Sequence, residues 1–391
     1  MNLREMEAVE KLFGFVKDKL MCSSTNLIYD HSISGGADDF PNADDCKKSF
    51  PNPCGWGTGM EDSMLAGGTM LEACVDLRES LDNADDFIKK TADGMLRCSE
   101  AALSEGFIPR SVCMSDGRSH YVDSSRDQYT LFIYGLHKYL RSGICSCDDR
   151  ARIKRAAEAV ARRANKNVTR ENGYDMLRDD GEKSIATVMW GNLENHEFMR
   201  LAMIYLFAYE AGGDKKWLFE YEKIFYKSIE NSLPMKSYWH LYAIHQMQAS
   251  LRLCYESDTD PVRKKLIADV MNTAAEYVVG QAGKIALKDG REPYNKKQLP
   301  FRECETEVQL SFKNMGIDCV SPIRPDMNDY FTLLGCADII ISTYLAPNGK
   351  EIITDKAIDL FWSAYEKLDF LKHDRNLPVY FLNALSKIQK Q

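Results

Sequence analysis

The sequence predicts an all-α protein whose helices form an (α/α)6 toroid, a ring of six helical hairpins. Two observations predict the class: apolar residues recur with helical spacing in twelve segments, and convincing strand alternation is lacking. The predicted helices are 3–21, 60–78, 83–104, 126–142, 149–167, 197–212, 215–230, 239–257, 261–280, 327–346, 355–367 and 378–390. Two short segments, 185–188 and 284–287, are the candidates for strands.

A third observation, the alternating length of the connections, predicts the toroid. Tight turns at 79–82, 143–148, 213–214, 258–260 and 347–354 each make two helices antiparallel neighbours. Much of the remaining chain lies in longer connections, at 22–59, 105–125, 168–196, 231–238, 281–326 and 368–377. If each helix reverses direction, the long loops share one face, and long loops in a compact domain are usually functional. We therefore expect the functional site on that face.

The helices divide into an inner and an outer set. The segments at 60–78, 126–142, 197–212 and 327–346 are rich in small and apolar residues, whereas 149–167 carries a charged face. We expect every second helix, beginning with 60–78, to line the centre of the ring. Six hairpins of about 65 residues account for all 391 residues, so we expect one domain over 1–391.

Composition narrows the classes of function. The net charge of −8 argues against a nucleic-acid partner, and apolar runs long enough to cross a bilayer are lacking. We expect the twelve cysteines to be mostly free thiols, and we expect no metal or cofactor because the sequence lacks HExxH, Walker and GxSxG motifs. The first helix lacks a signal peptide's apolar core, which favours a cytoplasmic or periplasmic location; the oligomeric state is not indicated.

Candidate catalytic residues lie where the predicted inner helices begin. Cleavage of a glycosidic bond needs a proton donor and a second carboxylate. Asp62 and Asp127 lie one hairpin apart at successive inner-helix starts and are the expected pair, with Glu61 and Glu197 in reserve. Acidic residues in a first helical turn also stabilise the helix dipole, which is the structural alternative for each of them.

Further residues at these helix starts suit sugar binding. Aromatic rings match the apolar faces of sugars, and arginine forks match a uronate carboxylate. The candidates for substrate binding are Trp56, Arg110, Arg126, Tyr129, Trp190, His196, Trp239, His240 and Arg324. Arg200 is a further arginine near the same face. Packing in the core is the alternative for the aromatic residues and histidines.

Four stretches resemble six-hairpin glycosidases, a superfamily of (α/α)6 enzymes that act on polysaccharides. They are GWGTGMEDSMLAGG, SSRDQYTLFIYGL, NHEFMRLAMIYLFAYEAGGDKKW and LPVYFLNAL. The resemblance implies the toroid fold and a carbohydrate-active enzyme, and most members are glycoside hydrolases. One branch, the unsaturated uronyl hydrolases, works without a metal through Asp residues at inner-helix starts, places comparable to those of Asp62 and Asp127.

The favoured function is therefore a glycoside hydrolase acting on an oligo- or polysaccharide. Two other classes stay open. A polysaccharide lyase or sugar epimerase could use the same fold, with His196 or His240 and a tyrosine such as Tyr129 as acid and base. A non-catalytic glycan-binding protein would keep its affinity when Asp62 and Asp127 are both replaced.

Overall fold

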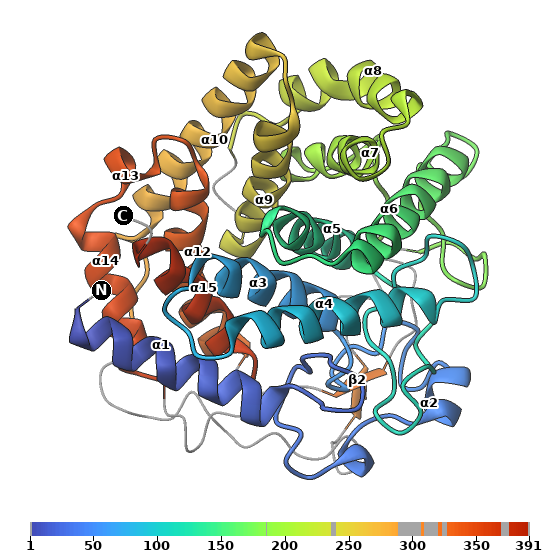
Figure 1. The fold of residues 1–391 in the computed structure, drawn as a ribbon, viewed down its shortest axis with the longest axis horizontal. Coiled ribbons are helices and arrows are strands. Elements are labelled where there is room, and N and C mark those ends of the chain that lie inside the picture. Colours follow the sequence, from blue (N-terminus) through green and yellow to red (C-terminus); the bar gives the residue numbers. More distant parts are fainter. Residues whose placement is uncertain are drawn as a thin grey trace.

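The computed structural model describes residues 2–184, 186–235, 240–287, 306–308, 320–322, 327–368 and 375–389, and most of this chain is helical (Figure 1). The long helices are α1 (Leu3–Phe15, continued by a π-helical segment, Val16–Leu20), α3 (Ser63–Asp76), α4 (Ala84–Glu100), α5 (Arg126–Arg141), α6 (Cys147–Asn167), α7 (Met199–Gly212), α8 (Lys215–Asn231), α9 (Leu241–Ser257), α10 (Pro261–Gln281), α12 (Met327–Leu345), α14 (Asp355–Tyr365) and α15 (Leu377–Gln389). The twelve predicted helices are all present, with ends that differ by a few residues. The all-α prediction is confirmed.

Short helices and strands lie within the long loops and within one turn. They are α2 (Ala43–Lys47), α13 (Gly349–Ile352), 3-10 turns at Ala37–Asp39 and Asn195–Glu197, and an antiparallel pair, β1 (Thr306–Val308) and β2 (Val320–Pro322). The predicted strand at 284–287 is wrong, since these residues form a turn and irregular chain. In the other predicted strand, Val188 makes only an isolated bridge with Asp175. Apolar runs this short do not specify a strand without a partner.

The helices close into a ring with two layers. The inner layer consists of α3, α5, α7, α9, α12 and α15, each packed against the next, and α15 packs back against α3. The outer layer consists of α1, α4, α6, α8, α10 and α14. Every second long helix therefore lies inside, as the apolar composition predicts.

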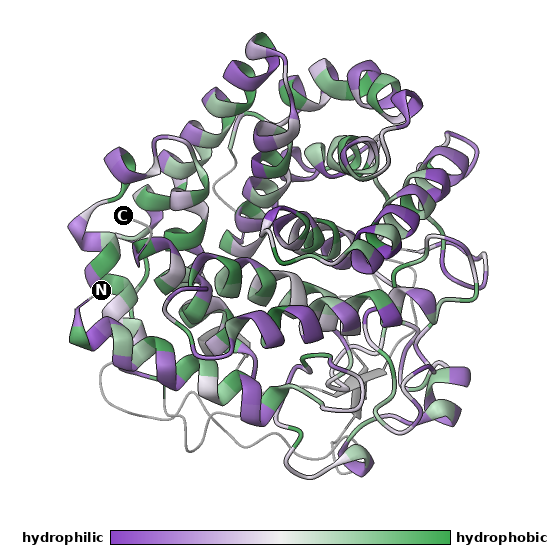
Figure 2. Ribbon diagram, viewed as in Figure 1, coloured by the Kyte–Doolittle hydropathy of each residue, from purple (hydrophilic) through white to green (hydrophobic). Residues whose placement is uncertain are grey.

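Burial follows these layers. In the inner helix α7 every residue from Met199 to Ala208 is buried, so the helix is covered on all sides. The outer helix α8 buries one stripe, which includes Trp217, Tyr221 and Phe225 at helical spacing. Figure 2 shows the same contrast between the largely green α12 and the purple-rich α6.

Two glycines fix how α3 and α5 meet. A Cβ on Gly68 would lie 1.9 Å from the carbonyl oxygen of Leu131, and one on Gly135 would lie 2.5 Å from Cα of Gly68. The two backbones are therefore in direct contact. This close approach sets the N-terminal ends of α3 and α5 side by side, and these ends carry Asp62 and Asp127.

Two further findings concern the described residues. Their ten cysteines all carry free thiols, as expected, and four of them (Cys74, Cys98, Cys254 and Cys336) are buried in long helices. Among the helices of the described residues, none is both long enough and apolar enough to cross a membrane.

Candidate active site

A cavity of about 420 Å³ lies at the N-terminal ends of the inner helices, on the long-loop face. Five inner helices contribute to its wall, through Leu65 of α3, Asp127 of α5, His245 of α9, Leu334 of α12 and Tyr380 of α15. Helix starts that are distant in sequence thus meet at one place.

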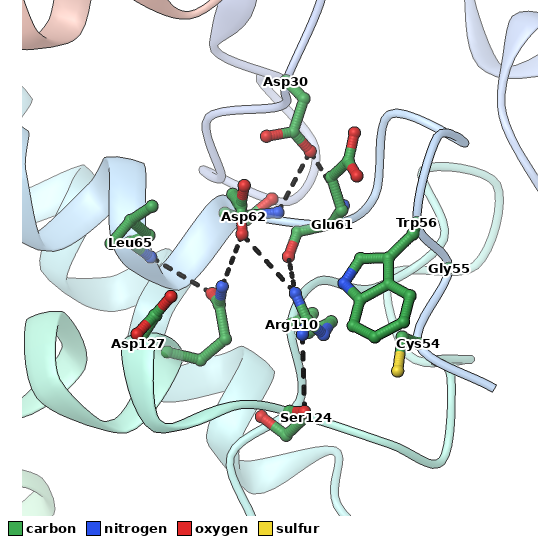
Figure 3. Close-up of polar contacts among 12 residues, drawn as sticks. Asp30, Cys54, Gly55, Trp56, Glu61, Asp62, Leu65, Arg110, Ser124 and Asp127 are labelled. Atoms are coloured by element: carbon green, nitrogen blue, oxygen red, sulfur yellow. Dashed lines mark hydrogen bonds and ion pairs between the residues drawn. The ribbon is translucent and has the colours of Figure 1, made fainter. Parts of the chain in front are cut away.

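Asp62 occupies the N-cap position of α3, but its side chain accepts no capping hydrogen bond from that helix. Instead, Oδ2 of Asp30 accepts the backbone N–H groups of Glu61 (2.8 Å) and Asp62 (3.1 Å). The Asp62 carboxyl is left to face the cavity, where Nε2 of Gln128 donates to it at 2.7 Å and Nη1 of Arg110 lies at 3.5 Å (Figure 3). Helix capping therefore does not explain why an aspartate stands at position 62.

Asp62 is poised to carry a proton near neutral pH. Burial raises the pKa of Asp62 to about 7, and the negative charges of Glu61 and Asp127 act in the same direction. The positive charge of Arg110 and the hydrogen bond from Gln128 oppose this effect without cancelling it. A third of the side chain, 34%, remains exposed to the cavity, so the proton is accessible to a ligand.

Asp127, in the first turn of α5, has the opposite tendency. Burial disfavours its ionised form, but the charge and hydrogen bond of Arg200, whose Nη1 lies 2.5 Å away, outweigh burial and lower the pKa of Asp127. Arg126 and Arg110 add to this effect. One cavity thus holds a carboxyl that retains its proton up to about neutral pH and a carboxylate that stays ionised, the division of roles that an acid and its partner require.

The two reserve carboxylates lie in different places. Glu61 lines the cavity and accepts a hydrogen bond from the backbone N–H of Gly57 at 2.9 Å. Glu197 does not line it: its carboxylate pairs with Nη2 of Arg126 at 2.5 Å and accepts the backbone N–H of Glu194. Arg126 thus holds Glu197 outside the cavity wall, so the structure does not bring this reserve candidate together with Asp62 and Asp127.

Trp56 and Arg110 also line the cavity, with the guanidinium of Arg110 5.3 Å from the centre of the indole ring. Arg110 additionally donates to the carbonyl oxygen of Glu61 at 2.9 Å (Figure 3). The loop that carries Trp56 is closely packed, since Gly59 has φ +88° and a Cβ there would lie 2.2 Å from Nε2 of His31. Glycine is thus required for the chain to pass this point.

Several candidates for substrate binding lie away from the cavity. Tyr129 is buried and accepts the backbone N–H of Ile108, and Trp190 packs edge-on against Phe198 at 5.6 Å. Burial and the charge of Arg200 lower the pKa of His196 to about 3, so this imidazole is neutral. His240, although exposed, lies beside the cavity rather than in its wall. Trp239 and Arg324 lie outside the described residues.

Tyr129 is buried in the core, and Trp190 and His196 are partly buried and do not line the cavity. Arg126 is likewise committed to the protein, since besides Glu197 it binds the carbonyl oxygen of Val188 at 2.8 Å.

Sequence reasoning missed a histidine–aspartate pair in the same cavity. Nδ1 of His245 lies 3.0 Å from Oδ1 of Asp338, and both side chains are buried. Within the described part of the chain, Nε2 of His245 and Oε1 of the neighbouring Gln246 have no hydrogen-bond partner, although both residues line the cavity. Buried polar atoms without partners are rare, so these two are candidates to bind a polar ligand.

Asp30 and Asn376 were missed as well. Nδ2 of Asn376 donates to Oδ1 of Asp30 at 3.1 Å, and Asn376 itself accepts the Tyr330 hydroxyl at 2.6 Å. Asp30 and Asn376 are far apart in the chain and belong to no motif, so no sequence pattern predicts that they lie in the cavity wall. Within the described residues, no three His, Cys, Asp or Glu side chains gather where they could hold a metal ion.

Comparison with known proteins gives a likeness in fold. No family model matches the chain, and no curated protein matches it. Among solved structures, it is similar to a crystal structure of a sugar epimerase from a ruminal bacterium, with a TM-score of 0.51 and 11% identity. The match covers 97% of this chain and 98% of that one. At this identity the likeness shows the fold alone, and it extends over nearly the whole toroid.

Proposed function

We propose that the cavity is the active site of a sugar-processing enzyme that cleaves a glycosidic bond. The observation that carries the proposal is the pair Asp62 and Asp127, which share one cavity and favour opposite protonation states. Glycosidases need such a pair of carboxyl groups on either side of the scissile bond. The aromatic wall, including Trp56 and Tyr242, suits the apolar face of a sugar ring.

In this proposal Asp62 is the general acid. Its proton passes to the glycosidic oxygen as the bond between that oxygen and the anomeric carbon breaks. Oxygen from water finally bonds to the anomeric carbon. Asp127, kept ionised by Arg200, stabilises the positive charge that develops there and either takes the proton of the attacking water or first attacks the carbon itself.

The contacts favour a neutral sugar at the reacting position over a uronate. Arg110 lies against Asp62, Arg126 is paired with Glu197, and Arg200 is paired with Asp127. These guanidinium groups pair with the chain's own carboxylates. Among the described residues, the cavity wall contains four carboxyl side chains (Asp30, Glu61, Asp62 and Asp127) and two guanidinium groups (Arg110 and Arg375). A substrate carboxylate would meet a wall already rich in negative charge.

A sugar epimerase is the second candidate, and His245 favours it. His245 lines the cavity, Asp338 fixes its ring, and its Nε2 has no partner among the described residues, an arrangement suited to removing a proton from a sugar carbon. The solved structure with the similar fold is also titled a sugar epimerase, which supports this alternative over hydrolysis. His245, rather than His196 or His240, would then be the base.

Isotope labelling separates these candidates. Neutral mono- and oligosaccharides would be incubated with the enzyme in H₂¹⁸O and in D₂O, and the products analysed by mass spectrometry and NMR. Hydrolysis predicts ¹⁸O in a newly formed reducing end and no deuterium at carbon. Epimerisation predicts deuterium at one sugar carbon with the glycosidic bond intact, and an unsaturated product from a uronate-containing oligosaccharide would indicate a lyase. Binding without any product would favour a glycan-binding protein.

A further inference from the structure

Three aromatic rings lie together beside the cavity, at the starts of α9 and α12. The ring centres of His240 and Tyr242 are 5.6 Å apart, those of His240 and Phe331 5.9 Å, and those of Tyr242 and Phe331 6.0 Å. The angles between the ring planes are only 21°, 34° and 29°. Three ring centres at nearly equal separations form a triangle and not a single column, so the rings make one cluster. We call these three residues the aromatic shelf.

The aromatic shelf faces water. His240 is exposed, and Phe331 keeps 38% of its surface exposed although it is a large apolar residue. Single exposed apolar side chains are common, but three aromatic rings gathered at the edge of a cavity are typical of a binding surface. Other exposed apolar side chains, such as Phe219 on α8, stand on the outer layer away from both cavities.

The shelf joins the proposed active site to a second cavity. Tyr242, Phe331 and Leu334 line the first cavity and also a neighbouring one of about 370 Å³. His240 lines only the second cavity. A ligand longer than the first cavity can therefore continue over the rings into the second cavity, whose wall also includes Lys284, Ile285 and Ala286 after α10.

We propose that the aromatic shelf binds a second, neutral sugar unit of the substrate, next to the unit that reacts. Sugar rings stack their apolar C–H faces on aromatic rings and keep their hydroxyl groups in water, which fits an exposed shelf better than a closed pocket. The inference rests on the proposed function and adds that the substrate has at least two sugar units.

Binding measurements test the shelf independently of turnover. The probes are glucose, xylose, mannose and galactose together with their homodisaccharides, measured by calorimetry on the Asp62→Asn protein so that no probe is consumed. We expect one disaccharide to bind more tightly than its monosaccharide, and His240→Ala in the same background to lower its affinity about five- to tenfold while leaving that of the monosaccharide nearly unchanged.

Phe219→Ala is the matched control, because it removes an exposed ring that touches neither cavity; it should leave both affinities unchanged. The proposal is overturned if no disaccharide binds more tightly than its monosaccharide, or if the gain survives both His240→Ala and Phe331→Ala. Failure of the proposed function would instead show as products formed by the Asp62→Asn protein in the same samples, whereas failure of the shelf would show only in the affinities.

Discussion

Neighbouring residues set the chemistry of each carboxyl in the cavity. If Asp62 is the general acid, activity must depend on its proton, which is present below a pKa of about 7 and lost as the pH rises through it. We expect kcat/KM to fall about tenfold per pH unit above pH 7. On the acid side, activity should persist below the ordinary pKa of an aspartate, because the pKa of Asp127 is lowered. A pH profile that is flat above 7 would contradict the assignment of Asp62.

Arg200 should control the acidic limb of that profile. Arg200→Gln removes the positive charge that keeps Asp127 ionised, so the pKa of Asp127 rises and activity should begin to fall at a higher pH than in the wild type. The pH dependence of kcat/KM checks this, with Arg155→Gln on the exposed face of α6 as the control. An unchanged acidic limb would show that Arg200 does not tune Asp127.

Residues with a local signal were easier to predict than residues defined by contact. Asp62 and Asp127 stand out because each begins an apolar helix, one hairpin apart. Asp30 has no such signal, since it acts by accepting backbone N–H groups from a segment 31 and 32 residues away. His245 stands at a helix start, but its partner Asp338 is 93 residues further on, and only the closed ring brings the two together.

At the level of elements, the loop before α3 depends on glycine. Gly59→Ala should lower the free energy of unfolding by about 2–4 kcal/mol, because the backbone is left-handed and a Cβ would overlap His31. Gly213→Ala is the control: φ is +77° there too, but the space is open, so only the backbone cost of about 1–2 kcal/mol applies. Urea unfolding compares the two, and equal losses would contradict the close packing.

Helices and loops differ in how far sequence determines them. Helical periodicity located the twelve long helices, because a helix that buries an apolar face has apolar residues at regular spacing in the sequence. The loops have no such regular spacing of apolar residues. The bridge between His31 and Arg375 and the turn at 284–287 follow from packing between distant segments, so the pattern along the chain could not specify them.

At the level of the whole molecule, a buried charge cluster joins the first and last inner helices. Nζ of Lys387 on α15 lies 2.6 Å from Glu72 and 2.5 Å from Asp76, both on α3. Lys387→Met would leave two buried carboxylates without their cation and should lower the free energy of unfolding by about 3–5 kcal/mol. Thermal unfolding checks this against Lys265→Met, whose side chain is 77% exposed. Similar stability of the two variants would mean that this cluster does not hold the ring closed.

The central claim is that the toroid brings Asp62 and Asp127 together as the catalytic pair. The most direct test measures kcat/KM of Asp62→Asn and Asp127→Asn on a substrate that the wild type turns over, with circular dichroism to verify the fold. Asp86→Asn on the outer helix α4, whose side chain is 65% exposed, is the control. We predict that each cavity variant loses activity at least about a hundredfold while folding normally, and that the control stays fully active. Full activity in either cavity variant would contradict the claim.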